Sequence, residues 1–211
     1  MVSEMVLHDP THLYEGEITP GTEKVAKVIS AVSYPPFLSA VVFILLSLSA
    51  DTITMAALSM AISVSTSLVI PVTAIMYYSR KFGNGDGDIV RREDRVRPFL
   101  VGIGSYIVGV VLLLLVGAPW ICTVTMMSYA TSTIIVLLIS TKWKISVHAT
   151  GLMGPIVLLA MVYDPAFAVL LLSFIPVAWS RYVRRKHTSA QLIAGAVFGS
   201  VYTAVFLSLL L

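Results

Sequence analysis

The sequence predicts an all-α fold, a polytopic transmembrane helical bundle with six to seven spans. Of the 211 residues, 57% are hydrophobic and only 12% are charged, whereas soluble domains carry about 25% charged residues. The mean hydropathy is +0.91, and the apolar residues gather into long runs, most of which approach or exceed the roughly 20 residues that a helix needs to cross a bilayer. Because lipid offers no hydrogen-bond partner to the backbone, each run is expected to be helical.

Two parts are predicted along the chain. Residues 1–27 are polar and net acidic and lack the basic start and apolar core of a cleavable signal, so we expect a retained N-terminal arm. Residues 28–211 are expected to form one transmembrane domain. Its apolar runs are Val28 to Ala50, Ile53 to Tyr78, Phe99 to Gly117, Trp120 to Thr141, His148 to Val162, Pro165 to Trp179 and Ser189 to Leu211. The fifth and sixth have about 15 residues each, which leaves the count between six and seven spans.

The connections between these runs fall into two sets. One set holds the arm and three charged loops, RKFGNGDGDIVRREDRVRP, KWKIS and RYVRRKH, and the other holds Ala50/Asp51, Ala118/Pro119, Tyr163/Asp164 and the C-terminus. All 14 Lys and Arg residues lie in the first set. The positive-inside rule places that side in the cytoplasm. We therefore expect a multi-pass protein of the cell membrane whose charged loops face the cytoplasm.

The charged loops are separated from one another by two spans each. The loops that end at Arg97, at Ser146 and at His187 must then emerge on the same side of the membrane. Polar clusters that are distant in the sequence are therefore expected to converge on one surface at the membrane interface.

The stretch SRYVRRKHTSAQ, residues 180–191, gathers positive charge around a single histidine. Four cations lie within one or two helical turns of His187: Arg181, Arg184, Arg185 and Lys186. Such a field favours an anion, and phosphate suits Arg geometry best, although the same cations could serve as anchors at lipid headgroups. His148 opens the fifth run on the same side. Two imidazoles can divide a phosphoryl transfer, since one attacks phosphorus and the other protonates the leaving oxygen.

Three short motifs in these loops resemble one family, the type 2 phosphatidic acid phosphatase superfamily. SRYVRRKH at residues 180–187 is identical to the opening of its third signature, SRx5HxxxD. ISVH at 145–148 resembles the second signature, PSGH, and RP at 97–98 matches the end of the first, Kx6RP. The motifs occur in the family's order and cover about residues 91–199. The membrane members of this superfamily are metal-independent lipid phosphatases with a bundle of about six helices.

The resemblance assigns a role to each matching residue. It implies that His187 attacks the phosphate to form a phosphohistidine, and that His148 acts as the acid for the departing lipid alcohol. It also implies that Arg97, Arg181 and Ser146 hold the phosphoryl oxygens and stabilise charge in the transition state. Residues 28–211 would then be a phosphatase-like domain.

The sequence departs from the family pattern at two positions. Val90 stands where the first signature has Lys, so Arg91, Arg92 or Lys144 is expected to bind phosphate in its place. Gln191 replaces the Asp that accepts a hydrogen bond from the nucleophilic ring. A Gln carbonyl can accept that bond, but the amide is uncharged and could equally donate, which would select the wrong tautomer. Four acidic residues on the same side offer a substitute charge or form a solvated loop: Asp86, Asp88, Glu93 and Asp94.

The expected activity is that of a phosphoric monoester or diphosphate hydrolase of the membrane. Its substrate would be a lipid phosphate or a prenyl or polyprenyl phosphate or diphosphate, and no metal or other cofactor is expected. Nucleic acid is not expected as a partner, because the basic residues lack interleaved aromatic residues. The oligomeric state stays open. Cys122 is the single cysteine, which excludes a disulfide framework.

Two alternatives remain open. A magnesium-dependent intramembrane prenyltransferase binds diphosphate through two Asp-rich loops, and NGDGD followed by RP resembles the first of them. The other two charged loops, KWKIS and RYVRRKH, contain no carboxylate, which disfavours magnesium. A non-catalytic transporter or scaffold is the second alternative. The spans carry no charged residue in their middles, whereas ion pathways normally need one.

Overall fold

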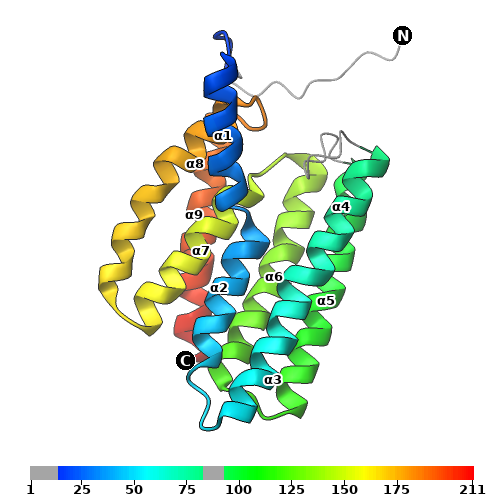
Figure 1. Ribbon diagram of the computed structural model, residues 1–211, viewed down its shortest axis with the longest axis vertical. Coiled ribbons are helices and arrows are strands. Elements are labelled where there is room, and N and C mark those ends of the chain that lie inside the picture. The colour runs from blue at the N-terminus through cyan, green and yellow to red at the C-terminus, as the bar shows by residue number, and fades with distance from the viewer. Residues whose placement is uncertain (1–13, 83–92) are drawn as a thin grey trace.

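The computed structural model describes residues 14–82 and 93–211, and all regular secondary structure within them is helical. The helices run up and down in one bundle (Figure 1), which confirms the predicted all-α polytopic fold. In the described part of the chain, six helical stretches are long and apolar enough to cross a bilayer: Pro20–Ser47, Ile53–Lys81, Val96–Leu115, Trp120–Lys142, Pro165–Val183 and Ser189–Leu210. A seventh apolar helix, Val147–Val162, has only 16 residues.

The first stretch consists of two helices, α1 (Pro20–Val32) and α2 (Pro35–Ser47). Thr19 caps α1 by accepting a hydrogen bond from a backbone N–H of the first turn at 3.2 Å. Residues 20–27, which the sequence analysis placed in the polar arm, are therefore helical. The two prolines that open α2 have no N–H to donate, so the helical hydrogen bonding is interrupted between α1 and α2.

The middle of the chain forms three long spans. Their helices are α3 (Ile53–Val64), α4 (Ile70–Phe82), α5 (Val96–Leu115) and α6 (Trp120–Lys142). A π-helical turn over Ser65–Val69 joins α3 to α4, so the two make one continuous span. Gly117 joins α5 to α6 with a φ of +67°, a conformation that glycine adopts without the steric cost of a Cβ.

The last third of the chain contains α7 (Val147–Val162), α8 (Phe174–Val183) and α9 (Ser189–Leu210). A 3-10 helix over Pro165–Ser173 precedes α8. Because a 3-10 helix rises about 2.0 Å per residue, this segment and α8 together reach about 33 Å, enough to span the hydrocarbon. In contrast, α7 is about 24 Å long against about 35 Å for α6. Its N-terminal end is therefore recessed below the upper end of α6 (Figure 1).

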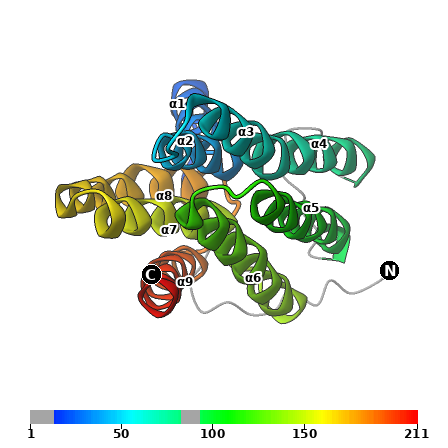
Figure 2. The ribbon, with the colours of Figure 1, turned by 90° about the horizontal axis from the view of Figure 1, so that it is seen from below.

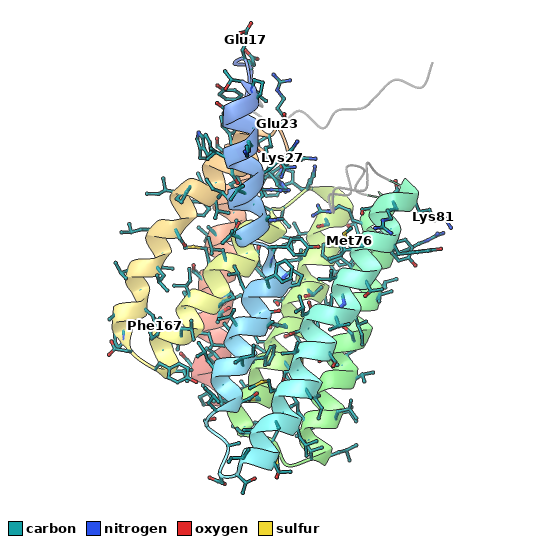
Figure 3. All side chains as sticks on the ribbon, in the orientation of Figure 1. Glu17, Glu23, Lys27, Met76, Lys81 and Phe167 are labelled. Atoms are coloured by element: carbon teal, nitrogen blue, oxygen red, sulfur yellow. The ribbon has the colours of Figure 1, made fainter. Side chains whose placement is uncertain are left out.

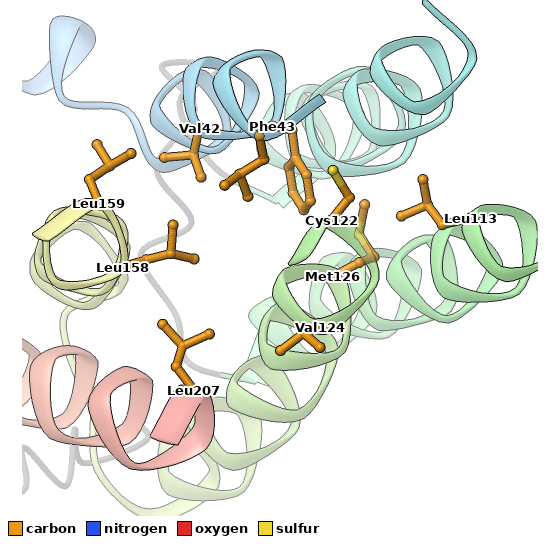
Figure 4. Close-up of a cluster of buried hydrophobic side chains, with 10 residues drawn as sticks. Val42, Phe43, Leu113, Cys122, Val124, Met126, Leu158, Leu159 and Leu207 are labelled. Carbon is orange, nitrogen blue, oxygen red and sulfur yellow. The ribbon is translucent and has the colours of Figure 1, made fainter. Parts of the chain in front are cut away.

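The apolar core lies in the lower half of the bundle as drawn in Figure 1, between α2, α5, α6, α7 and α9 (Figure 4). Ten buried side chains form it: Val42, Phe43, Leu46, Leu113, Cys122, Val124, Met126, Leu158, Leu159 and Leu207. Close contact between α7 and α9 depends on glycine, because a Cβ on Gly199 would lie 2.5 Å from the carbonyl oxygen of Thr150. Helices α7 and α9 are thus closely packed where Gly199 meets Thr150.

The basic residues gather at the opposite end of the bundle. Glu17, Glu23, Lys27 and Lys81 mark this upper end in Figure 3. The starts of α5, α7 and α9 lie at the same end (Figure 1), and the view along the bundle shows α6 between α5 and the pair α7 and α9 (Figure 2). The described parts of the three charged loops therefore converge at one end of the bundle, as expected.

Candidate functional site

A cavity of about 330 Å³ lies in the upper half of the bundle, among α2, α4, α5, α6, α7 and α9. The core cluster fills the bundle below it. Among the residues that the structure describes, six cations line the cavity: Arg95, Lys144, Arg181, Arg184, Arg185 and Lys186. His148 and His187 line it as well, and no carboxylate is found among the lining residues that the structure describes. The cavity is therefore suited to an anion.

His187 lies in the turn between α8 and α9. Arg185 ends α8 in the left-handed region, with a φ of 54°, and the next backbone N–H, of Lys186, donates to the carbonyl oxygen of Arg181 at 3.0 Å. This turn brings the chain back toward the bundle and leaves His187 only 3% exposed. The imidazole is thus held inside the cavity wall, between the two helices that carry the third motif.

Gln191 fixes the orientation and the tautomer of this ring. Its Oε1 lies 3.1 Å from His187 Nδ1 and also accepts the backbone N–H of Thr188 at 3.3 Å. In return, Thr188 Oγ1 accepts the backbone N–H of Gln191 at 3.3 Å, which completes a capping box at the start of α9. A backbone N–H can only donate, so the amide oxygen faces both groups and Nδ1 must carry the proton. Nε2 then keeps its lone pair.

The electrostatics of the cavity favour the neutral ring. Burial lowers the pKa of His187 well below its usual value of 6.5, and the positive charges of Lys144, Arg181 and Arg95 lower it further. The hydrogen bond to Gln191 acts in the opposite direction. At neutral pH the imidazole is therefore uncharged and able to act as a nucleophile through Nε2.

The second motif is joined directly to the third. The backbone N–H of Ser146 donates to the carbonyl oxygen of Gln191 at 3.3 Å. Ser146 is fully buried and caps α7 by accepting the backbone N–H of Ala149 at 3.4 Å. This places His148 in the first turn of α7, where its ring lies 5.8 Å from the ring of Tyr34. Ser146 thus positions His148, and its own side chain is not among the cavity-lining residues.

Arg181 is held by the first helix of the bundle. Its side chain is 2% exposed, and Nη1 donates to Ser30 Oγ at 3.5 Å. Ser30 Oγ lies 3.1 Å from Ser180 Oγ, so the serine of the third motif supports the same contact. The guanidinium is therefore fixed at the cavity wall, as a phosphate-binding role requires.

The structure places Arg95 at the cavity, whereas the sequence analysis selected Arg97. Arg97 is exposed and is not one of the described residues that line the cavity. The cavity-lining residues of this segment share one helical face: Arg95, Pro98, Phe99, Gly102 and Tyr106. Arg97 lies two positions from Arg95 and therefore on another face. The spacing of this face was visible in the sequence.

The sequence analysis named three substitutes for the missing Lys, two of them in the loop before α5. Arg91 and Arg92, the proposed substitutes for the missing Lys, lie outside the described residues, as do Asp86 and Asp88. Lys144, the third candidate, lines the cavity.

The tyrosines of the cavity were not predicted. Among the described residues, four of them line it: Tyr34 just before α2, Tyr106 on α5, Tyr129 on α6 and Tyr202 on α9. Ser and Thr side chains of the same helices accompany them, among them Ser39, Ser128 and Thr203. Only the packing of the helices shows which hydroxyls face a common space.

Within the described parts of the chain, no three His, Cys, Asp or Glu side chains form a group that could hold a metal ion. No protein-family model, curated protein or solved structure matches this chain. The superfamily resemblance therefore depends on the three short motifs, two of which the fold brings into direct contact.

Proposed function

We propose that the protein is an integral membrane phosphatase, a divergent relative of the type 2 phosphatidic acid phosphatases, that hydrolyses a lipid phosphate through a phosphohistidine. One observation carries the proposal. His187 lies in a cation-lined cavity with Nδ1 bonded to Gln191 Oε1, so that the neutral Nε2 is the nucleophile. The capping box of α9 holds the amide oxygen of Gln191 toward the ring, so a Gln at this position is compatible with the proposal.

The cavity walls account for phosphate binding. Arg181, Arg95 and Lys144 all line the cavity with His187, and their positive charges all lower the pKa of its ring. Their charges would offset those of the phosphoryl oxygens and stabilise the transition state. Arg95 takes the role that the resemblance assigns to Arg97.

The reaction follows in two steps. Nε2 of His187 attacks phosphorus while the bond from phosphorus to the lipid oxygen breaks, and His148 gives its proton to that oxygen. A water molecule, deprotonated by His148, then attacks the phosphohistidine and releases inorganic phosphate and the free Nε2. The bond from Nδ1 to Gln191 supports the positive charge on the ring in the intermediate.

The orientation in the membrane is part of the proposal. The described Lys and Arg residues lie at the end of the bundle that holds the cavity mouth, so the positive-inside rule would place this mouth in the cytoplasm of a cell membrane. That side favours substrates made there, such as prenyl or polyprenyl phosphates and diphosphates. A reporter fused to the C-terminus should then be found outside the cytoplasm, and a cytoplasmic reporter would refute this orientation.

Release of inorganic phosphate tests the activity. The purified protein is incubated in EDTA with prenyl diphosphates, prenyl monophosphates and glycerolipid phosphates, beside His187→Ala. Release that survives EDTA and is lost in the variant supports the proposal, and it excludes the magnesium-dependent alternative. Added imidazole should partly restore release by His187→Ala, which a purely structural role of the ring would not allow. Absence of release from every lipid would refute the proposal and favour a transporter or scaffold.

A further inference from the structure

Helices α6 and α9 pack directly on each other only at the lower end of the seam between them. There Trp120 Nε1 donates to the carbonyl oxygen of Leu210 at 3.1 Å. Val124 and Leu207 also belong to the same buried cluster. Toward the upper end the two helices diverge, as both views of the bundle show (Figures 1 and 2). The upper part of the seam, beside the cavity, is therefore closed by side chains rather than by helix packing.

One hydrogen bond crosses the seam between these ends. The hydroxyl groups of Thr131 on α6 and Tyr202 on α9 are bonded to each other. Thr131 donates its own proton to the carbonyl oxygen of Met127 at 2.7 Å, so Tyr202 is the donor across the seam. A phenol hydroxyl in hydrocarbon loses free energy when it has no partner. The bond therefore holds Tyr202 across the seam.

At Tyr202 the wall of the cavity is one side chain thick. Tyr202 lines the cavity, yet its hydroxyl reaches Thr131, which is exposed on the outer surface of the bundle. Ser132, the next residue of α6, lines the cavity and is partly exposed. A change in the rotamer of Tyr202 would thus connect the cavity to the bilayer without displacing a helix.

Aromatic side chains lie on both sides of Tyr202 along α9. The ring of Tyr202 stacks with Phe198 at 5.3 Å and with Phe206 at 5.6 Å, measured between ring centroids. The cavity itself, at about 330 Å³, is near the lower limit of the volumes that enclose a drug-sized ligand. A phosphate group with a long hydrocarbon chain does not fit inside, so the chain has to leave the cavity.

We infer that the cavity takes its ligand from the bilayer, and that the hydrocarbon chain of a lipid phosphate passes between α6 and α9 at Tyr202. Tyr202 is then the residue that determines whether a chain can pass. The phosphate end of this inference rests on the proposed function. The ligand class is a phosphate on a long hydrocarbon chain, and a soluble phosphate ester would not use the seam.

Narrowing the seam tests this path. Ser132→Trp adds a large side chain beside Tyr202, and Ser208→Trp makes the same change at an exposed position of α9 outside the cavity lining. Phosphate release is measured for a long-chain alkyl phosphate in nanodiscs and for soluble p-nitrophenyl phosphate. Ser132→Trp should lower the ratio of long-chain to soluble turnover by at least about tenfold, and Ser208→Trp should leave it unchanged. An equal ratio in both variants would overturn the inference.

A binding experiment separates this inference from the proposed function. A long-chain alkyl phosphate with a diazirine in the middle of the chain is photolysed with the wild-type protein in nanodiscs, and labelled residues are identified by mass spectrometry. Labels are expected on Phe198, Tyr202 or Ser132. Such labels without phosphate release would mean that the function fails and the binding path stands. Absence of labels, or labels confined to other helices, would overturn the path even where phosphate is released.

Discussion

The bond between His187 and Gln191 makes the sharpest prediction, because exchanging the amide for a carboxylate changes charge with almost no change in shape. In Gln191→Glu an oxygen can stay 3.1 Å from Nδ1 and keep both hydrogen bonds. An opposite charge this close raises the pKa of a histidine by about one to three units. Since one unit corresponds to about 1.4 kcal/mol, the added stabilisation of the imidazolium is about 1.4 to 4 kcal/mol.

Nitrogen-15 NMR of histidine-labelled protein in nanodiscs measures both the tautomer and the pKa. The chain has four histidines, and the spectrum of His187→Asn identifies the signal of His187. The wild-type ring should be neutral at pH 7, because its pKa is lowered well below 6.5. Its single proton should lie on Nδ1, which is bonded to Gln191 Oε1. In Gln191→Glu the titration midpoint should move up by about one to three pH units.

Gln191→Leu is the matched control, since it removes the acceptor and adds no charge. Two buried donors then lose their partner, the ring Nδ1 and the backbone N–H of Thr188. Each loss costs about 1 to 3 kcal/mol, so the protein should melt at a lower temperature. A wild-type ring that carries its proton on Nε2 would refute the reasoning. So would a titration midpoint that does not change in Gln191→Glu.

Three further predictions concern stability and binding. Stability should fall as pH drops below about 6.5, by at most about 1.4 kcal/mol per pH unit, because the unfolded chain gains a proton that buried His187 does not bind. Thermal unfolding should show a weaker pH dependence in His187→Asn. Gly199→Ala should destabilise the protein by about 1 to 3 kcal/mol, since the new Cβ would lie 2.5 Å from a carbonyl oxygen of α7. Gly104→Ala is the control: its Cβ would have no atom within 4 Å, so this variant should be about 1 kcal/mol more stable in the same melting assay. Arg95→Ala should raise the inhibition constant of inorganic phosphate about 10- to 100-fold, because a charged hydrogen bond to the phosphate is lost. Arg97→Ala should leave this constant unchanged.

Each of these has a contrary outcome. A pH dependence of melting that is identical in wild type and His187→Asn would mean that this ring takes up its proton equally in the folded and unfolded states. Melting changes of the same sign for Gly199→Ala and Gly104→Ala would contradict the close packing of α7 on α9. Equal weakening of phosphate inhibition in Arg95→Ala and Arg97→Ala would contradict the assignment of the two arginines to different faces of α5.

The spans were predictable because the bilayer imposes them. A membrane leaves an apolar run no alternative to a helix, so the runs could be identified from composition alone. The ends of the spans could not be predicted in this way where local capping or a change of helix type sets them. Helix α1 begins at Pro20, within the polar arm, because Thr19 caps it. The segment from Pro165 reaches across the bilayer because its first half is a 3-10 helix, which the sequence did not indicate.

The site was predictable as a set of residues, but its geometry was not. The motifs identified His187, His148 and Arg181, and all three line one cavity. The motif also selected Arg97. The helical periodicity of α5 instead predicts Arg95, because Arg95 lies on the face that is turned toward the bundle and Arg97 does not. The contact between Ser146 and the carbonyl oxygen of Gln191 joins residues 45 positions apart. No local pattern reports such a contact.

Gln191 illustrates why a departure from a motif has to be interpreted in its structural setting. Its side-chain oxygen accepts both the first free N–H of α9 and the Nδ1 proton of His187, so the start of the helix and the tautomer of the nucleophile depend on one atom. An Asp is one methylene shorter and reaches those two donors differently. A glutamine also adds no negative charge to a cavity whose lysines and arginines would bind the phosphate. Substitutions at this position should therefore change stability and activity together. Gln191→Glu is the exception, because it keeps both hydrogen bonds, and with them the stability of the helix start, while it changes the charge at the nucleophile and so the activity.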